Sequence, residues 1–148
     1  MIYLGADHGG FEFKEQIKVW LEEKGLKIQD MGAYSFDPAD DYPDFVIPLA
    51  KRVAEEPESL GLILGRSGNG EAMAANKVDG IRAVVCTNPR MAKMAREHNN
   101  ANIISLGADY MDLETAQEII QTFLDTPFTE EERHIRRINK ILELEKRN

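Results

Sequence analysis

Short apolar runs alternate with longer amphipathic stretches along this chain. The apolar runs are bounded by turn-forming residues and cover Ile2–Ala6, Leu26–Gln29, Leu60–Leu64, Ala83–Cys86 and Asn102–Leu106. Segments near 10–24, 43–56, 70–77, 89–97 and 112–125 have the length and period of amphipathic helices. Strands that alternate with helices form parallel sheets with a layer of helices on each face. The pattern therefore predicts a Rossmann-like three-layer α/β/α sandwich with a five-stranded parallel sheet.

The segment 129–148 is predicted to be a further helix that follows the α/β core of residues 1–128 within a single domain. Thr129 and Glu132 have the spacing of a capping box at its start. An apolar stripe follows at Ile135, Ile138, Ile141, Leu142 and Leu144. Because the stripe comes after a complete sheet, we expect it to pack on a partner subunit, so that this is a dimerisation helix. Packing on its own domain is the alternative.

The composition is that of an ordinary globular protein, with 43% hydrophobic and 30% charged residues in 148. A net charge of −8 argues against nucleic acid or an anionic membrane as the main partner, because both need a basic face. Cys86 is the only cysteine and lies in an apolar run, so we expect a buried small side chain rather than a nucleophile. Without a basic leader or a long apolar segment, the expected location is the cytoplasm.

A glycine-rich turn at residues 65–71 follows the third apolar run and leads into a helix-forming segment. Such a turn can aim several backbone N–H groups at one point, where they stabilise negative charge. The spacing of Gly65 and Gly70 is that of a P-loop, but Glu71 and Ala72 replace its Lys-Ser/Thr, and the dinucleotide and hydrolase-elbow patterns also fail. The turn therefore predicts a small oxyanion bound near a carboxylate base.

Polar residues follow four of the five predicted strands. They are Asp7 and His8, Ser67 to Glu71, Thr87 and Asn88, and Asp109. Ligands collect at the carboxyl ends of the strands in such folds, so these residues are expected to meet there. His98 and Asn99 instead end a predicted helix. Taken singly, Asp7, His98 and Asn99 also fit ordinary helix-capping roles.

Arg133 and Arg137 are four residues apart and share one face of the terminal helix. They fit two interpretations. The arginines can bind a phosphate through paired hydrogen bonds, or they can form an exposed basic face paired with Glu130 and Glu131.

Several motifs together resemble one known family. They are Asp7-His8-Gly9-Gly10-Phe11, Asp41-Tyr42-Pro43, Ser67-Gly68-Asn69-Gly70, Ala74-Ala75-Asn76-Lys77, Gly80-Ile81-Arg82-Ala83, Arg96-Glu97-His98-Asn99 and Arg133-His134. In this order and spacing the chain resembles the ribose-5-phosphate isomerase B family, part of a wider family that includes galactose-6-phosphate isomerase subunits. The resemblance covers nearly the whole chain.

The resemblance implies an aldose–ketose isomerase that acts on a sugar phosphate through an enediolate, without metal or cofactor. It implies a homodimer, or a dimer of dimers, with active sites shared between subunits. By the same resemblance, Asp7 and His98 help open the sugar ring, and Ser67 passes a proton between the two sugar oxygens. The enediolate oxygens are bound by Gly68, Asn69, Gly70 and Asn99. The phosphate is bound by His8, Arg133 and Arg137, and Tyr42 lines the sugar site.

Two positions depart from the commonest family pattern. Many members have a cysteine base where this chain has Gly65, whereas a second branch has Ser-Gly-Asn-Gly-Glu and uses the glutamate, which is Glu71 here. A carboxylate suits the task because it is neutral after taking the proton. Members also have an arginine that reaches the phosphate where this chain has Asp109.

Because Asp109 replaces a phosphate-binding arginine, the resemblance does not determine which sugar phosphate is the substrate. Ribose 5-phosphate is the default, and the alternatives are a tetrose phosphate or a hexose phosphate such as allose or galactose 6-phosphate. A silent sugar-phosphate-binding subunit is a further alternative, and a serine hydrolase that uses Ser67 and His98 is a more distant one.

Overall fold

The computed structural model describes residues 1–147. Five parallel strands form one sheet in the order β2-β1-β3-β5-β4. Their bounds are Ile2–Ala6 (β1), Ile28–Asp30 (β2), Leu60–Gly65 (β3), Ala83–Val85 (β4) and Ile103–Gly107 (β5). The five predicted strands are confirmed, although β2 begins two residues later than the apolar run that predicted it.

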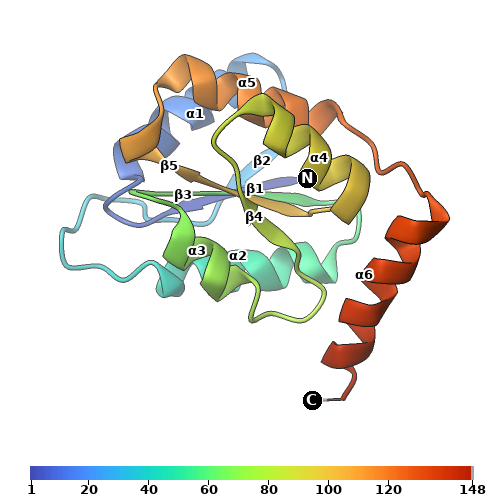
Figure 1. The fold of residues 1–148 in the computed structure, drawn as a ribbon. Coiled ribbons are helices and arrows are strands. Elements are labelled where there is room, and N and C mark those ends of the chain that lie inside the picture. The colour runs from blue at the N-terminus through green and yellow to red at the C-terminus, as the bar shows by residue number, and fades with distance from the viewer. Residues whose placement is uncertain (148) are drawn as a thin grey trace.

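Helices cover both faces of this sheet, as Figure 1 shows. α1 (Phe11–Glu23), α4 (Pro89–Asn99) and α5 (Leu113–Asp125) lie on one face, and α2 (Pro43–Glu55) and α3 (Asn69–Ala75) lie on the other. A short 3₁₀ turn, η1 (Ala108–Tyr110), follows β5. The predicted three-layer sandwich is therefore confirmed.

The central strands are buried on both faces, which explains why they are continuous apolar runs rather than alternating ones. Leu62 and Leu64 of β3 join an apolar cluster with α1, α4 and α5, whereas Ile63 between them joins a second cluster with α2. Cys86 is also buried, and burial raises the pKa of its thiol to about 12. The cysteine is thus a packed small side chain, as its sequence context predicted.

The terminal helix, α6 (Glu132–Glu145), extends away from the rest of the chain beside β4 (Figure 1). The predicted capping box is wrong, because the helix begins at Glu132 and Glu131 precedes it without a side-chain cap. The Thr129 hydroxyl donates instead to the carbonyl oxygen of Glu97 at 2.8 Å. The Thr129 hydroxyl therefore makes a tertiary contact with α4 and does not cap the helix.

The apolar stripe of α6 is only partly covered by its own chain. Ile138 is 9% exposed, whereas Ile135, Ile141 and Leu144 are 39%, 49% and 61% exposed. Packing against a partner subunit stays a prediction at this point.

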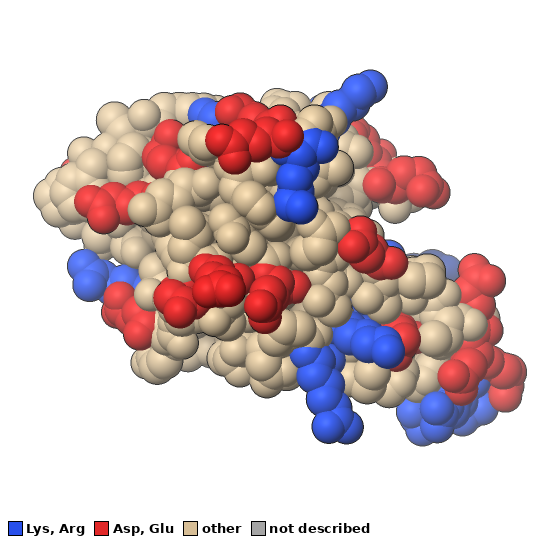
Figure 2. Space-filling view, turned by 90° about the horizontal axis from the view of Figure 1, so that it is seen from above, with Lys and Arg blue, Asp and Glu red and all other residues tan. Residues whose placement is uncertain are grey.

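Charge is spread over the face that Figure 2 draws, where acidic groups outnumber basic ones and no continuous basic surface is visible. None of the helices within residues 1–147 is long and apolar enough to cross a membrane.

Candidate active site

The glycine-rich turn lies at the carboxyl edge of the sheet, between β3 and α3. Gly68 has φ +83°, a left-handed conformation that costs glycine little. The buried Ser105 hydroxyl of β5 donates to the Gly68 carbonyl oxygen at 2.7 Å and holds the turn against the sheet. The Ser67 hydroxyl accepts a hydrogen bond from the Asn69 amide at 3.2 Å. Within residues 1–147, the Gly68 and Gly70 amides have no hydrogen-bond partner, so they are available to a ligand oxygen.

Glu71 is buried at the mouth of this turn, with 5% of its surface exposed. Its carboxyl group lies directly against Gly65, and a Cβ atom added at Gly65 would collide with that carboxyl group. A glycine at position 65 is therefore required to leave room for the Glu71 side chain. Burial, together with the negative charge of Asp7, raises the pKa of Glu71.

Asp7 and His8 follow β1 at the same edge. The Asp7 carboxylate accepts a hydrogen bond from the Gly9 amide at 3.0 Å. Asp40, in the loop before α2, accepts from both the His8 amide at 2.9 Å and the His8 Nδ1 at 2.6 Å. The hydrogen bond to Asp40 is the largest of the effects that raise the pKa of His8. Asp40 thus orients the ring and favours its cationic form.

Tyr42 reaches the turn from the start of α2. A Cβ atom added at Gly70 would lie 2.9 Å from the Tyr42 hydroxyl oxygen, so the phenol ring covers this glycine. The structure therefore brings together Asp7, His8, Tyr42, Ser67, Gly68, Asn69, Gly70 and Glu71. We call these residues the carboxyl-edge cluster.

The remaining predicted site residues lie elsewhere in the chain. α4 runs back along the sheet, so His98 and Asn99 are at the opposite edge, where the Asn99 carbonyl oxygen accepts from Arg82 Nε at 3.0 Å just before β4 begins. The His98 ring stacks on His134 of α6, with ring centroids 4.5 Å apart. Arg133 and Arg137 flank His134 on that helix. His98, Asn99, Arg133 and Arg137 form what we call the amino-edge cluster.

The two arginines of the amino-edge cluster differ in their surroundings. Arg133 Nε lies 3.0 Å from the Glu131 carboxylate, and both side chains are exposed. Arg137 is exposed and has no ion pair within residues 1–147. In the isolated chain, the interpretation as paired surface charge fits Arg133 and does not fit Arg137.

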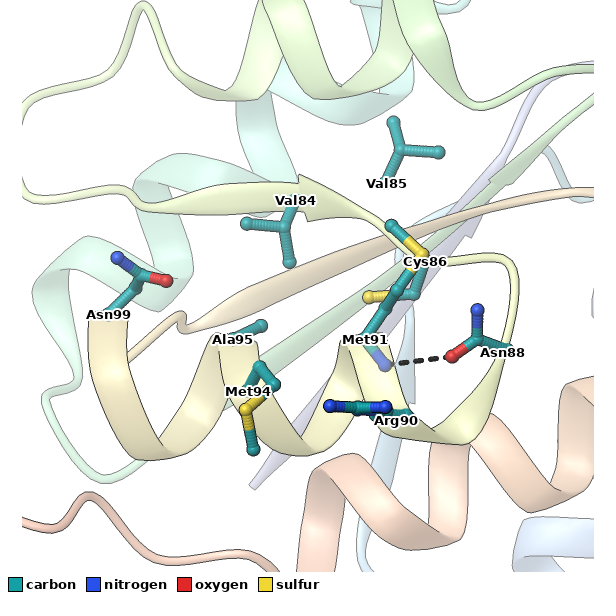
Figure 3. Close-up of a pocket in the computed structure, with 9 residues that line it drawn as sticks. All are labelled: Val84, Val85, Cys86, Asn88, Arg90, Met91, Met94, Ala95 and Asn99. Atoms are coloured by element: carbon teal, nitrogen blue, oxygen red, sulfur yellow. Dashed lines mark hydrogen bonds between the residues drawn. The ribbon is translucent and has the colours of Figure 1, made fainter.

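Two hollows lie along β4, the open edge of the sheet. The first, of about 420 Å³, is shown in Figure 3 and lies between β4 and α4, where Cys86, Met91 and Met94 line it. The Asn88 side chain at the start of α4 accepts from the Met91 amide at 2.9 Å, the dashed contact in Figure 3. The second hollow, of about 410 Å³, lies between β4 and α6 and includes Ile138 and Ile141. Asn99 lines both.

One group of side chains has the spacing of a metal site. Asp7, His8 and Asp40 each offer a ligand atom, and these atoms lie within 4.8 Å of one another. The hydrogen bonds between His8 and Asp40 account for the approach of two of the three groups. The absence of a metal requirement stays a prediction.

Three residues of this region were not predicted from the sequence. Asp40 and Ser105 reach the site from segments 32 and 37 residues away from their partners, and Arg66 lies between two recognised positions. The nearest sequence signal was the position of Asp40 in a loop rich in aspartate beside a sheet edge.

Comparison with known proteins identifies the family. The family model described as Ribose/Galactose Isomerase matches residues 2–141. The chain belongs to this family. Ribose-5-phosphate isomerase B of Mycolicibacterium paratuberculosis is 46% identical over 145 residues, which cover 98% of this chain and 91% of that protein.

Solved structures of the Ribose/Galactose Isomerase family share the fold. Ribose-5-phosphate isomerase B of Clostridium thermocellum is 42% identical, with a TM-score of 0.92 over 99% of this chain and 97% of that one. The enzyme of Mycoplasma genitalium with bound ribulose-5-phosphate is 36% identical, with a TM-score of 0.95 and the same coverage. The resemblance noted in the sequence is confirmed, whereas the roles of single residues stay predictions.

Proposed function

We propose that this protein interconverts ribose 5-phosphate and ribulose 5-phosphate, without metal or cofactor, with Glu71 as the base. The main support is the position of the buried Glu71 carboxyl group against Gly65, at the mouth of the glycine-rich turn. Further support comes from the relatives, which are named ribose-5-phosphate isomerase B, one of them with bound ribulose-5-phosphate.

Glu71 removes the proton from the second carbon of the open-chain aldose in the proposed reaction. The electron pair forms the double bond of an enediolate between the first two carbons, and negative charge develops on the oxygen of the first carbon. Glu71, now neutral, returns the proton to the first carbon and gives the ketose. Its raised pKa supports this role, because a base acts best when its pKa approaches the working pH.

The amides of Gly68, Asn69 and Gly70 stabilise the developing charge in this mechanism, as donors fixed before the reaction begins. Unpaired Gly68 and Gly70 amides support that role, while the Asn69 amide must exchange its contact with the Ser67 hydroxyl for one with the ligand. Ser67 passes a proton between the two sugar oxygens, and Tyr42 lines the sugar site.

A dimer completes the site in this proposal. Asp7 of one subunit and His98 of the partner subunit open the sugar ring, and Asn99 of the partner subunit binds an enediolate oxygen. The separation of the two clusters at opposite edges of one chain supports sharing between subunits. The exposed stripe of α6 and the two hollows along β4 supply an apolar surface for the partner.

The phosphate group binds between the subunits in the same proposal. His8 reaches it from the carboxyl-edge cluster, and Arg133 and Arg137 of the partner subunit reach it from the other side. The cationic form of His8 that Asp40 favours supports this assignment.

A coupled assay with a panel of sugar phosphates tests the proposed reaction. We expect the highest kcat/KM with ribose 5-phosphate and a much lower value with allose 6-phosphate, galactose 6-phosphate and a tetrose 4-phosphate. A higher kcat/KM with another sugar would reassign the substrate. Binding of one of these compounds without any turnover would identify a silent subunit instead.

A further inference from the structure

The carboxyl-edge cluster is strongly acidic for a site that binds a phosphate ester. Asp7 and Glu71 belong to it, Asp40 is hydrogen-bonded to its His8, and Asp109 lies on its rim. Three of these carboxylates have an explanation there, since Glu71 is the proposed base, Asp7 is proposed to help open the sugar ring and Asp40 is paired with His8. A dianionic group that enters such a site needs cationic side chains close by, because like charges at this range repel.

Arg66 is a cationic side chain at this edge, beside His8. It follows β3 directly, and its Cγ lies so close to Gly9 that a Cβ added there would be 2.6 Å away. The side chain therefore passes over the residue next to His8, on the side where Asp7 also lies. The charge of Arg66 acts on His8 by opposing the rise of its pKa, which supports this proximity.

A hydrogen bond holds the backbone of Arg66, whereas the end of its side chain is free to contact a ligand. Its carbonyl oxygen accepts from the Asp109 amide at 3.0 Å, which ties the turn to the segment after β5. The side chain is exposed, and within residues 1–147 its guanidinium has no ion pair or hydrogen bond. The guanidinium of Arg66 is therefore available to a ligand at the entrance of an acidic site.

We propose that Arg66 binds the phosphate group of the substrate together with His8. The inference rests on the proposed function and adds a binding residue to the same site. A guanidinium presents a planar pair of donors to two phosphate oxygens, and it stays charged at any working pH. Arg66, in the turn that follows β3, thus supplies the positive charge that Asp109 does not supply.

Steady-state kinetics of Arg66→Gln tests this assignment. We expect KM for ribose 5-phosphate to rise about tenfold to a hundredfold while kcat changes less than about threefold, because a charge-assisted contact to the non-reacting end is lost. Arg66→Lys should recover part of the loss, since lysine keeps the charge without the paired geometry. Lys27→Gln, at the amino edge before β2, removes an exposed charge elsewhere and should leave KM unchanged.

A second-site variant separates binding from a structural role. Asp109 is exposed on the same rim, so Arg66→Gln combined with Asp109→Arg should lower KM again by about tenfold relative to Arg66→Gln alone. A structural role of Arg66 would not be rescued in this way. An unchanged KM in Arg66→Gln, or a loss confined to kcat, would overturn the inference.

Calorimetry with inorganic phosphate tests whether Arg66 binds phosphate, independently of the reaction that the protein catalyses. We expect Arg66→Gln to weaken phosphate binding at least about tenfold, whichever sugar the enzyme converts. Equal affinities of the wild type and the variant would overturn the role of Arg66 even if ribose 5-phosphate is the substrate. Weaker binding without turnover of ribose 5-phosphate would keep Arg66 and reject the proposed reaction.

Discussion

Glu71 meets two requirements of a base that carries a proton between neighbouring carbons. It is buried, so water does not compete for the proton, and burial together with the charge of Asp7 raises its pKa from the ordinary value of 4.5. Gly65 makes both properties possible, because any larger residue would occupy the space of the carboxyl group. Gly65 and Glu71, six positions apart, thus form one structural unit, in which the glycine leaves the space that the carboxyl group fills.

Replacing Glu71 by glutamine tests this role directly. The amide keeps the size of the side chain but cannot accept the proton, so we expect kcat to fall about a thousandfold or more with KM nearly unchanged. Glu118→Gln, an exposed position on α5, is the matched control and should behave as the wild type. Near-normal turnover in Glu71→Gln would show that another group is the base.

The contact between His8 and Asp40 predicts a pH dependence of substrate binding. Asp40 raises the pKa of His8, so the wild type keeps a cationic imidazole to higher pH than an isolated histidine would. In Asp40→Asn this pKa falls, and we expect KM to begin its rise with pH at a lower pH than in the wild type, by about tenfold at pH 8.

Each variant is compared with the wild type at the same pH, because the substrate phosphate also titrates near neutrality. Asp44→Asn, exposed in the first turn of α2, is the control. If the KM values of the wild type and of Asp40→Asn changed with pH in the same way, Asp40 would not control the pKa of His8.

The sequence was sufficient to locate site residues that are close together along the chain. The turn from Gly65 to Glu71 is contiguous, so its position after β3 and its backbone donors could be predicted together, whereas the role of Glu71 as the base stays a prediction. Asp40 and Ser105 could not, because their contacts join segments more than 30 residues apart and their residue types are common in ordinary loops and strands. Long-range contacts of common side chains leave no local signal.

At the scale of elements, strands and helices were predictable because their patterns are strong and their ends carry glycine or proline. α1 ends shortly before Gly25 and α2 begins at Pro43, and these residue types commonly end and begin helices. The capping box at Thr129 failed for a physical reason, since its hydroxyl contacts Glu97 of α4 instead. The sheet order also could not be deduced, because β5 lies between β3 and β4 through contacts that no local pattern encodes.

The terminal helix provides a test of assembly. Ile141 is 49% exposed in the single chain and lines the hollow beside β4, so Ile141→Asp should cost an isolated chain little. In a dimer the new carboxylate would be buried without a partner, at a cost of several kcal/mol. We expect a dimeric wild type and a monomeric variant in sedimentation analysis.

Activity should be lost together with the dimer in this test, because a monomer would hold only half of each proposed site. Val19→Asp is the matched control, since Val19 is 54% exposed on α1, away from β4. The control should stay dimeric and active. A dimeric Ile141→Asp, or a fully active monomer, would contradict the proposed role of α6.

At the scale of the whole molecule, the two clusters raise a question that one chain cannot answer by itself. Both are built from residues that the family resemblance places in a single active site, yet α4 carries His98 to the amino edge while Glu71 stays at the carboxyl edge. The proposed symmetric dimer would resolve this if its two-fold axis brought the amino edge of each subunit to the carboxyl edge of the other.

Mixed dimers test this arrangement. Glu71→Gln and His98→Asn should each be nearly inactive as homodimers, because both sites then lack one residue. In a dimer with one chain of each kind, one site has lost both residues and the other is intact, so two-fold symmetry predicts about half of the wild-type kcat per dimer. Co-expression with two different affinity tags and purification on both isolates the mixed species for the assay. If mixed dimers are as inactive as their parents, Glu71 and His98 do not meet across subunits, and the shared site must be abandoned.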